Sequence, residues 1–380
     1  MTLKKVYMDR TERSSTYRSN KIRKENPVMK VRKAYVVAPR KIEIMEEELP
    51  ALQENQVLLK TVSVGMCHTD LPSFLGTNGT QVSKHGFVRM GVGEQAFPCD
   101  VGHEPVAQVV EVGKSVRNFR VGEYVGGFFG GAFSDYLVID DNTRTFCTIP
   151  ETDGKPVKYC CAEPLGCLVN IIREASCKYG DNIAVVGCGF MGLMTIAGLR
   201  RSGANKLVAV DLLDNKLALA RELGATHTIN PKDGEADDAA WELTDGKFFD
   251  VVVEITGSLK GLDTACSIIK QPHEGGMDQF DGTYRGLGKL LIPSVYAGKE
   301  VFPPRLAFNL MTRTPVLYAT HPTFATRPRE NMQEGIRSYL DGRLPMEKLV
   351  THEFPFEEIQ SAFEMLAHPA PDYVKGIVTF

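Results

Sequence analysis

Three glycines, Gly187, Gly189 and Gly192, have the G-x-G-x-x-G spacing of a turn that binds dinucleotides. They follow the apolar run 183–186, which is short enough to be a buried parallel strand, and they precede an apolar run that we expect to be helical. The first glycine allows a tight turn, the second lets the backbone approach a pyrophosphate, and the third lets helix and strand pack closely. Because the start of a helix offers unpaired N–H groups to phosphates, the pattern predicts a dinucleotide site.

An acidic residue, Asp211, ends the next predicted strand 24 residues after Gly187. A carboxylate at this distance binds both hydroxyls of the adenosine ribose and repels a 2'-phosphate. No arginine or lysine follows before Lys216, so the sequence favours NAD over NADP. The alternative is a glycine-rich turn without a ligand. The residues that we expect to contact the cofactor are Gly187, Gly189, Phe190, Met191, Gly192, Asp211 and, after a later predicted strand, Gly257.

Three distant side chains, Cys67, His103 and Glu163, could together hold a metal ion, because each lies near a glycine or proline at a predicted loop edge. A catalytic zinc takes three such ligands and keeps one position open. Each residue also has a structural interpretation. Cys67 could be a small buried hydrophobic residue, His103 a hydrogen-bonded loop histidine, and Glu163 an acid that faces a helix dipole. Spacing alone leaves both interpretations open.

The predicted elements change in kind along the chain. The first part has short strands separated by glycine turns, which indicates a small β-rich domain. These strands are expected at 34–37, 42–45, 56–64, 107–112, 124–129 and 133–138, with a loop at 71–97. The later part alternates strands and helices, which indicates a doubly wound parallel sheet. Its strands are expected at 183–186, 206–211, 227–229, 250–254 and 289–293, and its helices at 168–175, 216–223 and 262–269. Helices at 334–340 and 356–366 and a strand at 373–380 are expected to return to the first domain.

Composition and charge exclude several classes of function. The 380 residues exceed one typical core, so we expect two domains. A net charge of -3 gives no electrostatic basis for binding nucleic acid or an anionic membrane. The longest apolar stretch, 183–199, contains four glycines and the dinucleotide motif, so we expect no membrane span. Small-molecule chemistry is therefore the expected function.

The cysteines and the amino terminus bear on location. Nine cysteines, an odd number without the density of a disulfide scaffold, and the lack of a recognisable signal peptide predict a cytoplasmic protein. Residues 1–30 contain nine lysines or arginines against three acidic residues and few apolar ones, so we expect a flexible basic extension. A nucleic-acid-binding arm is the alternative interpretation of this segment.

Four segments occur in the order seen in zinc-dependent medium-chain alcohol and polyol dehydrogenases: 65–70 (Gly-Met-Cys-His-Thr-Asp), 102–104 (Gly-His-Glu), 163–165 (Glu-Pro-Leu) and 187–211. The chain resembles this family from Lys33 to its end. The resemblance implies an α/β fold with a GroES-like β-rich catalytic domain, residues 31–165 together with 321–380. A Rossmann domain with a doubly wound parallel sheet would comprise residues 166–320.

The resemblance also implies one catalytic zinc ion bound by Cys67, His103 and Glu163. The third ligand is a cysteine in the classical alcohol dehydrogenases, and a glutamate in a Glu-Pro context looks like the polyol branch, which includes sorbitol dehydrogenase. Cys161 and Cys167 are rival candidates for this third position.

Further roles follow from the same resemblance. Glu104 is expected beside the metal as a transient ligand, and Asp70 as the carboxylate that orients a metal-binding histidine. Thr69 matches the family's proton-relay hydroxyl, and His68 is expected to face the cofactor phosphates. Lys375 stands where an arginine usually meets the pyrophosphate, although a solvated strand end is an equal alternative.

The chain departs from the family's pattern at two places. The classical relay ends on a histidine three residues after the threonine, and Pro72 occupies that position here. The final proton acceptor is therefore solvent, Glu104 or another residue. No cysteine lies between Glu104 and Cys147, where the family's structural zinc has four, so we predict that this second zinc site is absent.

The resemblance implies an NAD- and zinc-dependent dehydrogenase of a secondary alcohol of polyol, sugar or cyclitol type, expected to be a homodimer or homotetramer. The predicted loop contains four large apolar residues, which suggest an apolar pocket wall and favour a less polar alcohol: Phe74, Phe87, Met90 and Phe97. Two alternatives stay open: a zinc-free NADPH-dependent quinone or enoyl reductase of the same superfamily, and a non-catalytic nucleotide-binding protein. A variant that restores its NAD within each turnover, as in epimerisation, is also compatible with the sequence.

Overall fold

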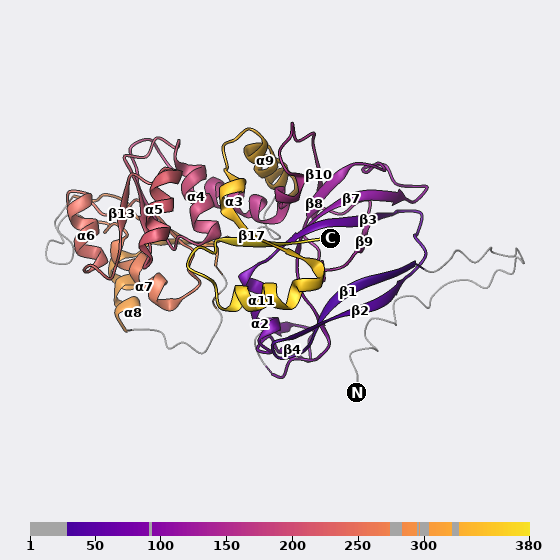
Figure 1. The fold of residues 1–380 in the computed structure, drawn as a ribbon. Coiled ribbons are helices and arrows are strands. Elements are labelled where there is room, and N and C mark those ends of the chain that lie inside the picture. Colours follow the sequence, from indigo (N-terminus) through magenta and orange to yellow (C-terminus); the bar gives the residue numbers. More distant parts are fainter. Residues whose placement is uncertain (1–28, 91–92, 274–282, 295, 297–303, 321–326) are drawn as a thin grey trace, which may run out of the picture.

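A computed structural model describes residues 29–90, 93–273, 283–294, 296, 304–320 and 327–380, with no side-chain description at 88–90 (Figure 1). The predicted basic extension, residues 1–30, lies outside the described residues except for its last two. Those two begin strand β1. Figure 1 shows a β-rich half, which contains both the early strands and the carboxyl-terminal ones, beside a half in which helices surround a second sheet.

The β-rich half is built on a seven-stranded sheet within the described residues, with the order β10-β8-β7-β3-β18-β17 and β9 also paired with β3. Alternate residues of β3, including Val57 and Leu59, are buried against the cluster that contains Phe146, as expected for a strand with one face on the core. The strands are β3 (Gln56–Gly65), β7 (Glu104–Val112), β8 (Tyr124–Gly127), β9 (Tyr136–Asp140), β10 (Phe146–Ile149), β17 (Val350–Pro355) and β18 (Lys375–Thr379). Because β18 pairs antiparallel with β3, the end of the chain joins this sheet.

Smaller elements complete this half. A three-stranded sheet consists of β1 (Met29–Ala38), β2 (Lys41–Leu49) and β6 (Cys99–Asp100). Helices α2 (Leu71–Phe74) and α11 (Ile359–Ala367) lie in this half, with short 3-10 helices at His68–Asp70, Val157–Tyr159 and Phe356–Glu358. Helices α3 (Ala162–Ala175), α9 (Pro328–Leu340) and α10 (Met346–Leu349) contribute to a buried cluster that both halves share. The prediction of a loop at 71–97 was wrong in part, because this segment contains α2 and a hairpin of β4 (Thr80–Val82) and β5 (Val88–Met90).

The other half has a parallel sheet with the order β13-β12-β11-β14-β15-β16. All five residues of β11 are buried, because helices cover both faces of the sheet. The strands are β11 (Asn182–Val186), β12 (Lys206–Val210), β13 (His227–Ile229), β14 (Val251–Glu254), β15 (Lys289–Ile292) and β16 (Val316–Ala319). The helices are α4 (Phe190–Leu199), α5 (Asp214–Leu223), α6 (Ala236–Leu243), α7 (Leu259–Ile268) and α8 (Pro304–Arg313). The polar, glycine-rich segment 271–288 lies partly outside the described residues, but His273 and Tyr284 form a β-bridge.

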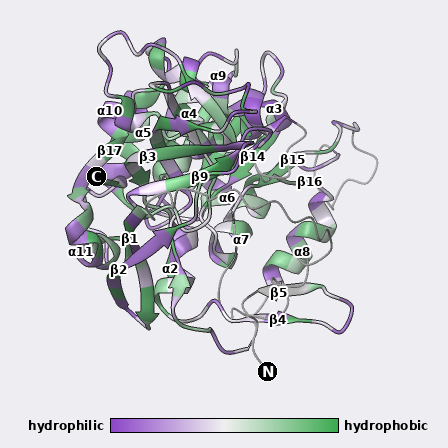
Figure 2. Ribbon diagram, turned by 90° about the vertical axis from the view of Figure 1, so that its right-hand side faces the viewer, coloured by the Kyte–Doolittle hydropathy of each residue, from purple (hydrophilic) through white to green (hydrophobic). Residues whose placement is uncertain are grey.

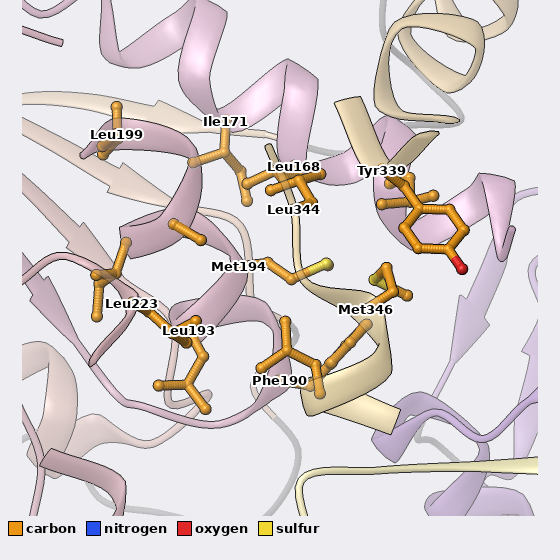
Figure 3. Close-up of a cluster of buried hydrophobic side chains, with 14 of the residues drawn as sticks. Leu168, Ile171, Phe190, Leu193, Met194, Leu199, Leu223, Tyr339, Leu344 and Met346 are labelled. Carbon is orange, nitrogen blue, oxygen red and sulfur yellow. The ribbon is translucent and has the colours of Figure 1, made fainter. Parts of the chain in front are cut away.

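Two buried clusters lie on opposite faces of this sheet, and the first extends into the β-rich half, where it includes Val106 and Ile377. Ile183 and Val185 of β11 enter one buried cluster, whereas Ala184 and Val186 enter another on the opposite face of the sheet. Figure 3 shows the first cluster, in which Leu168 of α3 lies near Leu344 from the carboxyl-terminal part of the chain. In Figure 2 hydrophobic residues concentrate in the central strands and helices, and hydrophilic residues lie mainly on the outer loops and helix faces.

Helix α3 begins at Ala162, six residues before its predicted start. Proline is tolerated in the first turn of a helix, where the N–H groups have no intrahelical partner, so Pro164 does not delay the helix. Glu163 therefore lies in the first turn of a buried helix rather than in a loop.

Among the described helices, none combines the length and the apolar composition that crossing a bilayer requires.

Candidate active site

Three potential metal ligands, Cys67, His103 and Glu104, have ligand atoms within 4.8 Å of one another. The pairing of β3 with β7 brings them together, because Gly65 is the cross-strand partner of Glu104. Cys67 follows the end of β3, and His103 immediately precedes β7. A Cβ on Gly65 would overlap the carboxylate of Glu104, so only glycine at this position leaves room for that side chain. Strand register thus creates a cluster with one thiol, one imidazole and one carboxylate.

The ring of His103 is oriented by Asp70. Its Nδ1 lies 3.1 Å from Asp70 Oδ1, which also accepts a hydrogen bond from the backbone N–H of Gly102 at 3.1 Å. Because Asp70 is a carboxylate acceptor, Nδ1 carries the proton and Nε2 is left facing the cluster. Burial alone would lower the pKa of His103, but the charge and hydrogen bond of Asp70 raise it to about 12. The same carboxylate would stabilise a metal cation held at Nε2.

The hydroxyl of Thr69 lies against the same cluster. It donates a hydrogen bond to Cys67 Sγ at 3.2 Å and lies 3.4 Å from His103 Nε2. Thr69 is exposed, so it can reach a small molecule at the cluster. Its neighbour His68 is also at the surface, and desolvation together with the nearby charge of Lys375 lowers the pKa of His68.

The structure places Glu163 beside the cluster rather than within it. Its Oε1 accepts a hydrogen bond from the Cys167 thiol at 3.3 Å, one helical turn further along α3. Burial and the negative charge of Glu104 raise the pKa of Glu163 to about 7. Glu163 lies close enough to Glu104 for this charge to act on it, which is compatible with its predicted role as third ligand. Ligation by Glu163 stays a prediction.

Lys375 connects the cluster to the dinucleotide turn. Its Nζ donates to Glu104 Oε2 at 2.6 Å and lies 4.8 Å from the centre of the Phe190 ring, at the start of α4. Lys375 is only 4% exposed, so the alternative of a solvated strand end was wrong. Burial alone would lower the pKa of Lys375, but the charge of Glu104 raises it above its ordinary value.

The three glycines of the dinucleotide turn differ in their surroundings. Gly187 has φ +101°, and a Cβ there would lie 2.8 Å from the side chain of Thr256. A Cβ on Gly192 would overlap the carbonyl oxygen of Gly187, whereas a Cβ on Gly189 would meet no atom within 4 Å. Gly187 therefore permits the turn, Gly192 the close packing of helix and strand, and Gly189 exposes its backbone to open space where a phosphate can approach.

The residues predicted to contact the cofactor around the turn offer backbone and carboxylate groups. The Phe190 side chain is buried in the core and Met191 packs partly against it, so their N–H groups are the parts available to a phosphate. Asp211 Oδ2 accepts from the backbone N–H of Cys188 at 2.6 Å, which holds this carboxylate beside the turn. Gly257, with φ +70°, lies just beyond β14.

Sequence reasoning missed Phe128, whose ring centre lies 5.7 Å from that of His103. It belongs to the short turn 128–132 after β8. The backbone N–H groups of Gly131 and Ala132 donate to the carbonyl of Gly102 at 3.0 and 3.1 Å, and Phe129 N–H donates to that of His103 at 3.2 Å. This turn fixes the backbone of the histidine loop. Its adjacent glycines and aromatic residues were the available sequence signal.

The predicted apolar pocket wall is only partly compatible with the structure. Phe74 is fully buried, with its ring centre 5.2 Å from that of Phe363, and it therefore belongs to the core. Phe97 packs partly against the same core cluster, whereas Phe87 is 70% exposed. The side chain of Met90 lies outside the described residues. Phe128 is the aromatic residue that the structure places beside His103.

Comparison with known proteins gives matches over most of the chain. Residues 53–151 match the family model of the alcohol dehydrogenase GroES-like domain, and residues 191–273 match that of the zinc-binding dehydrogenases. The uncharacterized zinc-type alcohol dehydrogenase-like protein YdjJ of Escherichia coli is 26% identical, with 92% of this chain and 99% of that protein covered. Sorbitol dehydrogenase 1 of Saccharomyces cerevisiae is 26% identical, with 89% and 94% covered. The crystal structure of an Escherichia coli oxidoreductase of unknown specificity superposes with a TM-score of 0.75 at 23% identity, with 92% and 99% covered.

Proposed function

Because the chain belongs to the zinc-type medium-chain dehydrogenase/reductase superfamily, we propose that it transfers a hydride between a secondary alcohol and NAD, with one zinc ion per chain. The observation that carries the proposal is the cluster of Cys67, His103 and Glu104, within 4.8 Å of one another. Lys375 links this cluster directly to the first turn of the dinucleotide helix. The activated substrate oxygen and the nicotinamide ring would thereby meet between the β-rich half and the half with the parallel sheet.

The donor set fits zinc, which prefers thiolate, imidazole and carboxylate ligands in a four-coordinate site. Cys67 and His103 would hold the ion, with Glu163 as the proposed third ligand and Glu104 as a rival already in the cluster. Zinc bound here would act as a Lewis acid that lowers the pKa of an alcohol hydroxyl. Asp70 keeps the ring of His103 in place, and Lys375 holds Glu104.

Thr69 is the side chain best placed to handle the alcohol proton. Its exposed hydroxyl lies between Cys67 and His103 and can accept a hydrogen bond from a substrate hydroxyl. Beyond it, Pro72 lies in α2 and has no titratable group. Glu104 is held by Lys375, so we propose that the proton passes from Thr69 to solvent.

We propose a polyol, sugar or cyclitol substrate. A glutamate at the expected third ligand position and the similarity to sorbitol dehydrogenase 1 support this class. The ring of Phe128 beside His103 supplies one apolar wall, which would contact the carbon skeleton of the substrate.

We retain residues 31–165 with 321–380 and residues 166–320 as the two domains. The pairing of β18 with β3 supports this division, although residues 321–326 lie outside the described part. A cytoplasmic location is supported by the cysteines, because all nine lie in the described residues and none forms a disulfide.

Metal analysis beside a screen of NAD reduction over polyols, sugars and cyclitols tests the proposal. We expect about one zinc per chain and activity that is lost on treatment with a chelator and restored by zinc. Metal-independent activity that prefers NADPH would favour the zinc-free quinone or enoyl reductase. Nucleotide binding without turnover of any alcohol would favour a non-catalytic protein.

Replacing Asp211 with serine should lower the preference for NAD over NADP by about ten- to a hundredfold, because the repulsion between a carboxylate and a 2'-phosphate disappears. The ratio of kcat/KM for the two cofactors measures this preference. Asp214→Ser, a change of the same kind at an exposed acid in the first turn of α5, is the control and should leave the ratio unchanged. An unchanged ratio in Asp211→Ser would mean that the ribose contact is assigned wrongly.

We also propose that the chain forms homodimers or homotetramers through β16. Among the described strands it is the edge of the parallel sheet, and Leu317 on it is 51% exposed. Phe308 and Met311 of the neighbouring helix α8 are exposed as well. An apolar edge strand can pair with a second copy about a two-fold axis.

Leu317→Lys should therefore shift the protein toward the monomer, as measured by sedimentation velocity. Val121→Lys is the matched control, since Val121 is 60% exposed in the β-rich half and should not affect assembly. A monomeric wild type, or a Leu317→Lys variant with unchanged mass, would exclude this interface.

A further inference from the structure

Glu254 is a fully buried acid to which the proposed chemistry assigns no role. It is the last residue of β14 and has 0% exposure. Its Oε1 accepts hydrogen bonds from the backbone N–H of Thr256 at 2.8 Å and from the Thr256 hydroxyl, and its Oε2 accepts one from the hydroxyl of Tyr296. Tyr296 lies four residues beyond the end of β15 and packs against the second buried cluster of this half. One carboxylate thus joins the ends of two neighbouring strands.

This junction lies at the carboxyl edge of the sheet, where dinucleotides bind. The glycine turn follows β11, and Asp211 follows β12 on one side of it, whereas β14 and β15 lie on the other side. Because the acid on β12 marks the adenosine half of a dinucleotide, the nicotinamide half extends over β14 and β15. Thr256 also touches the turn itself, since its Cγ2 would lie 2.8 Å from a Cβ on Gly187.

A buried carboxylate is costly unless its oxygens are hydrogen-bonded, so its partners are held firmly. Burial raises the pKa of Glu254, and the hydrogen bonds from Thr256 and Tyr296 oppose that rise. The hydroxyl of Tyr296 has Glu254 as its acceptor and burial raises the pKa of this hydroxyl, so it remains a donor at neutral pH. The hydrogen bond from Tyr296 to Glu254 therefore holds the backbone at Tyr296 next to the end of β14.

We propose that Glu254 and Tyr296 are positioning residues that hold the backbone at Thr256 and at Tyr296, beyond β14 and β15, in the arrangement that receives the nicotinamide half of the cofactor. This inference rests on the proposed function, because it takes the ligand of the crevice to be a nicotinamide dinucleotide. Neither side chain needs to touch the reacting atoms. Their role is to fix the backbone on one side of the pyrophosphate turn.

Binding of NADH and of AMP to the full-length protein separates the two halves of the cofactor. In Tyr296→Phe we expect the dissociation constant for NADH to rise about tenfold, the typical effect of losing one hydrogen bond to a charged group. The constant for AMP should stay within about twofold, because AMP occupies only the adenosine half. Tyr179→Phe, at a position that is 94% exposed, removes the same hydroxyl elsewhere and should change neither constant.

Kinetics and a second variant distinguish positioning from general stability. We expect Tyr296→Phe to raise KM for NAD more than it lowers kcat, and Glu254→Gln, which keeps an acceptor, to lose less than Glu254→Ala. Adding Tyr296→Phe to Glu254→Ala should cause no further loss, because the hydrogen bond between the two residues is already lost. Additive losses, equal weakening of AMP and NADH, or unchanged NADH binding would each overturn the inference. A wild type that binds neither nucleotide would contradict the proposed function and the inference together.

Discussion

Cys67→Ser and His103→Gln are each expected to reduce bound zinc from about one ion per chain to nearly none and to lower kcat/KM on the order of 10³-fold. Each variant removes one potential ligand from the cluster of Cys67, His103 and Glu104, whose ligand atoms lie within 4.8 Å of one another. The size of the effect follows from the Lewis-acid contribution, which is several kcal/mol, with about 1.4 kcal/mol for each factor of ten. Mass spectrometry of the metal content and steady-state kinetics on the same preparations provide the two measurements.

Matched controls separate the loss of a ligand from the loss of a cysteine or histidine as such. Cys177→Ser changes a partly buried cysteine beyond the end of α3, and His85→Gln an exposed histidine of the β4–β5 hairpin. Both should keep full zinc content and activity. A Cys67→Ser variant with normal zinc and normal turnover would show that the metal, if any, is bound elsewhere.

Lys375→Met is expected to destabilise the zinc-free protein by about 3–5 kcal/mol, because it leaves the buried carboxylate of Glu104 without its counter-ion. The two side chains are 5% and 1% exposed, and their charged atoms are 2.6 Å apart. The double variant Lys375→Met/Glu104→Gln should regain a large part of this loss, since no unpaired charge then remains in the interior. Urea denaturation of chelator-treated protein gives the free energies of unfolding.

An exposed ion pair provides the comparison for this second result. Lys30 and Glu46 are 67% and 68% exposed, so Lys30→Met should cost less than about 1 kcal/mol. If Lys375→Met costs no more than Lys30→Met, or if Glu104→Gln only adds to its loss, the buried pair does not stabilise the fold in the way described.

Patterns of hydrophobicity and glycine predicted the main elements because they reflect local requirements. The glycines at 187, 189 and 192 and the buried run before them predicted β11 and α4. Helix α8 was missed because its buried face includes Asn309 and Arg313, which hide the apolar period. Helix α6 was missed because its buried residues, Ala236 and Ala240, are small and give a weak signal.

Residues of the candidate site that belong to a family motif were predictable from the sequence. Contacts that depend on how strands and turns pair were not. The family resemblance pointed to Cys67, His103 and Asp70, and the structure brings their side chains together. The resemblance also placed Glu104 beside the metal, and in the structure its pairing opposite Gly65 is what brings it into the cluster. The contact of Phe128 with His103 likewise depends on a turn that reaches back across the sheet.

The turn 128–132 has a consequence for a cell that is short of metal. Its N–H groups donate to the carbonyls of Gly102 and His103, and Asp70 accepts from the N–H of Gly102, so these contacts involve neither an ion nor a sulfur atom. If zinc is bound as proposed, its loss would abolish activity while this loop kept its shape. Activity would then return with the ion, without new synthesis of the protein.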